Sequence, residues 1–164
     1  MMLLLLGTGV VAADEFPLSN KRPLPAGDGW RVLYADFPAS FELAYRVAFA
    51  TDRASYAVVW AMASGSSGPA PIVAFDSQVI ALFATGANSC TAAVSFDRVV
   101  FDAERRLVHA EISETRTCML LDLTSSAVFV VALARDRLPV APFTLQLGSE
   151  RLCHDCPDAI TVDF

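Results

Sequence analysis

Beyond residue 77, the apolar residues of this chain come in short runs, and each run is closed by turn-forming residues. Residues 78–84 are apolar almost without interruption, which is typical of a central strand covered on both faces. Residues 92–101 and 106–113 flank a polar turn at 102–105 and predict a β-hairpin. Because runs of this length are typical of strands, we expect further strands at residues 127–135, 143–147 and 159–164.

The first half of the chain contains two more strand patterns and one helical pattern. Apolar side chains alternate with other residues from Phe41 to Phe49, which predicts a half-buried strand, and residues 30–36 predict another. The period then changes. Thr51 or Asp52 can cap a helix, and Gly65 can end it in a left-handed conformation. The apolar positions at helical spacing between them are Tyr56, Val59, Trp60 and Ala63.

These elements predict a mainly β fold, either an antiparallel β-sandwich or a strongly bent sheet of about seven strands with one short helix at about residues 52–64. Trp60 is expected to anchor that helix on the sheet. A chain of 164 residues, 54% of them apolar, is long enough to bury one substantial core. We therefore expect residues 30–164 to form a single β-rich domain.

The charge balance excludes one class of function. Twelve basic residues face eighteen acidic ones, and the net charge of −6 leaves no basic surface for a nucleic acid. No run of about 18 uninterrupted apolar residues is present, so we expect no stable membrane span.

The N-terminus indicates a compartment. Residues 1–13 are uncharged and have the size of a secretory h-region, with the small residues Val11, Ala12 and Ala13 at its end. We interpret them as a signal peptide of a secreted or periplasmic protein, the alternative being a buried N-terminal segment of the domain. Residues 14–29 are rich in proline and glycine and are expected to form an extended N-terminal arm.

Four cysteines form an even set in a chain that we expect to meet an oxidising compartment. Cys90 precedes the first strand of the predicted hairpin and Cys118 follows the second, so the two are expected to pair at its open end. Cys153 and Cys156 would then form the second disulfide.

Candidate chemistry is sparse because the chain has only two histidines. His109 shares one side of its strand with Glu111, and such a pair can polarise a nucleophile. No nucleophile motif accompanies the pair, so we expect His109 to be a solvent-exposed strand residue. We predict no catalytic, cofactor-binding or metal-binding residues and no cofactor.

The segment Cys153, His154, Asp155 and Cys156 has three interpretations. A structural disulfide is favoured by the secretory interpretation. A metal site would lack a complete ligand set, and a redox-active pair would need the N-terminus of a helix.

The order of elements also matches a family pattern. A helix containing Trp60 (residues 57–60) is followed by residues 71–75 and by a strand at 79–83 that ends near Gly86. A hairpin beginning near Cys90 and a late strand at 128–134 complete it. With these features, residues 56–147 resemble the PrcB-like family of secreted domains, named for an accessory subunit of an extracellular protease complex. The resemblance implies a β-rich fold and an accessory role, and it brings no catalytic residue.

We expect a non-enzymatic extracytoplasmic domain that binds another protein, as an accessory or stabilising partner of a secreted protease or envelope protein. One alternative is a small secreted enzyme or thiol-disulfide oxidoreductase that uses residues 153–156, and another is a β-sandwich protease inhibitor. The candidate interaction loop adjoins the predicted helix, because a flexible glycine- and serine-rich stretch beside a rigid helix can adapt to a partner. It consists of Ser64, Gly65, Ser66, Ser67 and Gly68.

Overall fold

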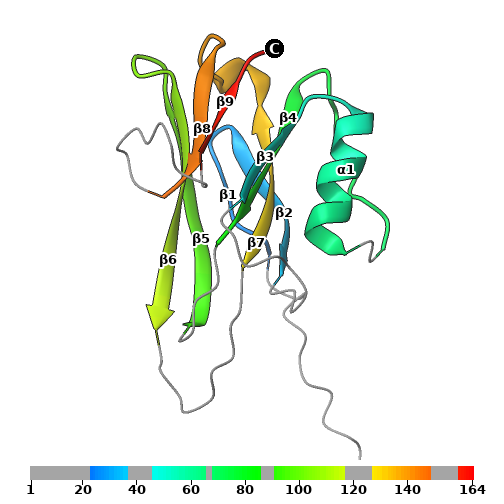
Figure 1. The fold of residues 1–164 in the computed structure, drawn as a ribbon, viewed down its shortest axis with the longest axis vertical. Coiled ribbons are helices and arrows are strands. Elements are labelled where there is room, and N and C mark those ends of the chain that lie inside the picture. The colour runs from blue at the N-terminus through cyan, green and yellow to red at the C-terminus, as the bar shows by residue number, and fades with distance from the viewer. Residues whose placement is uncertain (1–22, 37–45, 66–67, 86–90, 117–126, 149–158) are drawn as a thin grey trace, which may run out of the picture.

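The computed structural model describes residues 23–36, 46–65, 68–85, 91–116, 127–148 and 159–164. Their strands form two sheets that pack face to face, and one helix covers the outer side of the first sheet (Figure 1). The mainly β fold with one short helix is confirmed, with nine strands in the described part of the chain. Among these residues, no helix is both long and apolar enough to cross a membrane.

The first sheet has five strands. In spatial order they are β1 (Ala26–Gly27), β2 (Trp30–Asp36), β7 (Val128–Ala134), β4 (Gln78–Ala84) and β3 (Arg46–Ala50), and all neighbours are antiparallel. The short strand β1 lies within the segment 14–29 that the sequence assigns to an extended arm. Residues 37–45, which include the first half of the strand expected from Phe41, lie outside the described residues.

The second sheet has four strands. In spatial order they are β5 (Thr91–Asp102), β6 (Leu107–Arg116), β8 (Phe143–Leu147) and β9 (Ala159–Val162). β5 and β6 form the expected hairpin, and β6 pairs with β8 in parallel. A short 3-10 helix, η1 (Arg135–Arg137), follows β7 in the chain.

The continuous apolar run of β4 is explained by its two covered faces. Val79, Ala81 and Phe83 belong to the core between the two sheets, whereas the alternate residues Ile80 and Leu82 belong to a second core beneath the helix. Each of these side chains is fully buried. A strand buried on both faces needs no polar alternation, so the prediction of a central strand is confirmed.

Helix α1 (Arg53–Ser64) begins and ends where its capping residues predict. The Asp52 carboxylate accepts a hydrogen bond from the Ser55 amide at 2.8 Å, and the Ser55 hydroxyl closes a capping box. Gly65 ends the helix with φ of 57°, a left-handed conformation that favours glycine. Trp60 is half-buried, with its ring 5.1 Å from that of Tyr34 on β2. Trp60 therefore contacts the sheet from α1, and its anchoring of the helix stays a prediction.

Arg135 connects several segments at one end of the first sheet. Its Nε donates to the Phe75 carbonyl and its Nη2 donates to the Thr51 carbonyl, both at 2.8 Å. The guanidinium also lies 5.6 Å from the centre of the Phe164 ring. The residues that precede α1 and β4 are therefore held to the end of β7.

Candidate functional site

The predicted interaction loop is only partly within the described residues. Ser64 is 6% exposed and donates to the Trp60 carbonyl at 2.8 Å, so it belongs to the helix rather than to a contact surface. Gly65 and Gly68 are exposed, and the Gly68 carbonyl accepts a hydrogen bond from the Trp60 indole at 3.2 Å. Ser66 and Ser67 lie outside the described residues, as do all four cysteines, Cys90, Cys118, Cys153 and Cys156.

Apart from Arg53 in its first turn, the solvent side of α1 carries no charge, which is unusual for the exposed side of a helix on a folded domain. We call this surface the α1 outer face, and it consists of Ala54, Ala57, Val58 and Ala61, all exposed. Val58 is 62% exposed, and Ile72, in the segment that follows the helix, is 94% exposed. Contiguous apolar side chains left in water are typical of an interaction surface, so Val58 and Ile72 are candidate contact residues.

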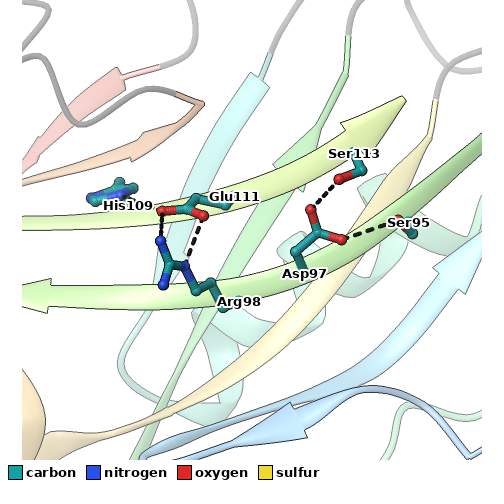
Figure 2. Close-up of polar contacts among 6 residues, drawn as sticks. All are labelled: Ser95, Asp97, Arg98, His109, Glu111 and Ser113. Carbon is teal, nitrogen blue, oxygen red and sulfur yellow. Dashed lines mark hydrogen bonds and ion pairs between the residues drawn. The ribbon is translucent and has the colours of Figure 1, made fainter. Parts of the chain in front are cut away.

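A second candidate site lies on the outer side of the β5–β6 hairpin, where six polar side chains gather (Figure 2). The Arg98 guanidinium binds both carboxylate oxygens of Glu111, at 2.7 and 2.8 Å. The His109 Nε2 lies 3.3 Å from the nearer oxygen of the same carboxylate. Hydrogen bonds from Arg98, and to a smaller extent the contact with His109, hold the pKa of Glu111 below its ordinary value.

The expectation that His109 is solvent-exposed is wrong. Its side chain is only 2% exposed. Its neighbours on this side of the sheet are buried as well, with Leu107 1% exposed and Gln146 3% exposed. Gln146 is the register partner of His109 on β8. Alternation along β6 correctly predicts that His109 and Glu111 share a side, but a period of two does not reveal whether that side is covered.

The remaining side chains of the cluster form a separate group. The carboxylate of Asp97 accepts hydrogen bonds from the hydroxyls of Ser95, at 3.1 Å, and Ser113. These two serine hydroxyls therefore bind Asp97 and not the imidazole of His109. A catalytic triad for acyl transfer needs a nucleophile hydrogen-bonded to a base, and that base hydrogen-bonded to an orienting carboxylate. The described side chains instead form two cross-strand contacts, Arg98 with Glu111 and Asp97 with Ser113, which are suited to holding β5 on β6.

The described part of the surface also contains a cleft. A shallow cleft of about 400 Å³ is lined by Asp76, Ser77, Gln78, Ala134, Arg135 and Asp136. The Arg135 guanidinium in its wall is already bound to two backbone carbonyls. Within the described ranges, no group of three or more His, Cys, Asp or Glu side chains is placed to hold a metal ion.

Comparison of the chain with protein-family models, with curated proteins and with solved structures gives no match.

The fold and its surface define a β-sandwich domain with one helix whose outer face is uncharged. The sequence carries the signal for that surface, since residues 54–64 contain no charged side chain. The predicted interaction loop begins at the C-terminal end of this stretch.

Proposed function

We propose that this chain is a non-enzymatic protein-binding domain that holds its partner on the α1 outer face together with Ile72. The observation that carries the proposal is the exposure of Val58 on the α1 outer face and of Ile72 in the uncharged segment 68–72 that follows the helix. The apolar residues 1–13 support an extracytoplasmic location. The resemblance to the PrcB-like family supports an accessory role toward a secreted protease or envelope protein.

Burial of the Val58 and Ile72 side chains against a partner would contribute favourable free energy of binding. Removing a Val or Ile side chain from water contributes about 1.5 to 3 kcal/mol when burial is complete. The alanines around Val58 also permit close approach, because their side chains add little bulk between two packed backbones.

The helix beneath this surface is held by buried side chains, a cap and an indole hydrogen bond. Tyr56 and Val59 are buried between α1 and the sheet, the Asp52 cap fixes the start of the helix, and Trp60 holds the following segment through Gly68. Because the outer face is not part of either core, its side chains can be replaced without loss of the fold.

The proposal is tested by charge introduced at the two anchors. The partner is first captured from the native secreted fraction with the full chain, identified and purified. Its dissociation constant is then measured for Val58→Glu and Ile72→Glu, with Val140→Glu as the matched control. Val140 is 79% exposed and lies between η1 and β8, outside the proposed surface.

We expect each anchor variant to weaken binding at least tenfold and the control to bind as the wild type does. Melting temperatures within a few degrees of wild type would show that the variants are folded. Equal weakening in all three variants, unchanged binding in the anchor variants, or capture of no protein would each refute the proposal.

A further inference from the structure

β5 is an edge strand. It is the first strand of the four-stranded sheet and pairs on one side with β6 (Figure 1). Among the described residues, no strand pairs with its other side. The strand spans twelve residues, so it presents a long row of backbone groups that can bind another strand.

The backbone groups that face outward follow from hydrogen bonds on the far side of β6. The carbonyls of Arg106 and Ala110 accept from amides of the β8 segment, at 2.8 and 2.9 Å, so these residues face β8. Successive residues of a strand direct their backbone groups to alternate sides. Leu107, His109, Glu111 and Ser113 therefore face β5.

The β5 residues that pair with these four face β6 in return. Their register partners are Asp102, Val100, Arg98 and Ser95, respectively. The residues between them direct their amides and carbonyls outward, and these are Val94, Phe96, Val99 and Phe101. Asp97 is an extra residue at a bulge, since Phe96 pairs with Ile112 and Arg98 pairs with Glu111.

The bulge gives the open edge an irregular spacing. Outward residues are two apart on either side of it but three apart across it, from Phe96 to Val99. A regular strand presents groups at every second residue and can match only half of this edge. A second copy of β5 running antiparallel has the same spacing in reverse, because the pattern is symmetric about the point between Asp97 and Arg98.

We propose that this chain forms a two-fold dimer in which β5 pairs with β5 of a second copy. Val94 then lies opposite the partner's Phe101, and Phe96 lies opposite the partner's Val99. All four side chains pack on the core between the sheets. The two four-stranded sheets thus join into one sheet with its apolar side continuous.

Charge complementarity favours the same occupant. At the centre of the pair, Asp97 lies opposite the partner's Arg98, and the two-fold axis repeats this contact. The Arg98 side chain is 59% exposed, so a second carboxylate can reach it. Charges and a bulge normally protect an edge strand from pairing with other chains. Here the same features exclude regular strands and match a second copy.

Two measurements test the dimer. Sedimentation equilibrium of the full chain gives its mass in solution, which we expect to be twice that of one chain. The register is tested with the double variant Ser95→Cys/Val100→Cys. Ser95 lies opposite the partner's Val100 at a pair that is not hydrogen-bonded across the dimer, where Cα atoms are about 4.5 Å apart and a disulfide can form.

The single variants and the wild type are the controls for the double cysteine variant. Residues 95 and 100 of one chain are about 16 Å apart along a strand, so they cannot bridge within that chain. In either single variant the new cysteine has no cysteine opposite it. We expect oxidation to give a covalent dimer in the double variant, with peptides around residues 95 and 100 linked. The single variants and the wild type should give no additional cross-link.

A monomer mass at every concentration would overturn the proposal. So would a dimer whose double variant shows no link between residues 95 and 100, since that dimer would use another surface. Equal cross-linking of the single variants would show random collision and would also contradict the register.

Discussion

Replacing Trp60 by alanine measures how strongly α1 is held to the five-stranded sheet. Emptying a fully buried aromatic site costs about 3 to 5 kcal/mol. Trp60 is half-buried, so part of this cost is absent. The edge-to-face contact with Tyr34 at 5.1 Å contributes about 0.5 to 1.5 kcal/mol. The indole hydrogen bond to the Gly68 carbonyl contributes about 1 kcal/mol. Together with the lost apolar burial, we expect Trp60→Ala to lower the free energy of unfolding by about 2 to 3 kcal/mol.

Trp60→Phe is the matched variant, because it keeps an aromatic ring against Tyr34 and removes the indole N–H. It should cost about 1 kcal/mol. The assay is urea unfolding followed by far-ultraviolet circular dichroism, since tryptophan fluorescence changes with the substitution itself. A Trp60→Ala variant within about 0.5 kcal/mol of wild type would refute the anchoring role. Equal losses in both variants would refute the importance of ring packing.

Three further outcomes are expected. Arg98 lowers the folded-state pKa of Glu111, so the Glu111 carboxylate stabilises the fold above its unfolded pKa of about 4.3 and loses this effect as pH falls through the lower folded pKa. Glu111→Gln should therefore flatten the decline of the urea midpoint below about pH 4.5. An unchanged decline in the variant would contradict this contribution. Asp52→Ala should lower the urea midpoint and Asp52→Asn should retain most of it, since asparagine also caps helices; equal losses would exclude the cap. Peptide mapping of the oxidised protein should link Cys90 to Cys118, because the register pairs the flanking ends of β5 and β6, and linkage of Cys90 to Cys153 or Cys156 would exclude this pairing.

Much of the fold is readable from the sequence because its determinants are local. The Asp52 cap and the Gly65 terminator delimit α1 at the residues that the capping rules predict. The apolar run of β4 also predicts a strand covered on both sides before any neighbour is known. In both cases the side chains that decide the outcome lie within one element.

Features that depend on contacts between distant segments are not readable in this way. His109 has the alternation of a strand residue, but its burial depends on what covers the second sheet. The bulge at Asp97 breaks the alternation of β5, since Asp97 and Arg98 are adjacent polar residues between Phe96 and Val99, but two adjacent polar residues do not by themselves indicate a bulge. Only the register with β6 shows that one of them is extra.

The two proposed surfaces are compatible because they lie on different layers of the sandwich. α1 covers the outer side of the five-stranded sheet, whereas β5 is the edge of the four-stranded sheet (Figure 1). A two-fold pair through β5 therefore leaves an α1 outer face exposed on each copy, and a partner with two matching sites would gain avidity from the pair. Val58→Glu should then leave the mass of the dimer unchanged, and the covalent Ser95→Cys/Val100→Cys dimer should bind two partner molecules with the wild-type affinity per site. Binding of one partner molecule per covalent dimer would show that the two surfaces interfere.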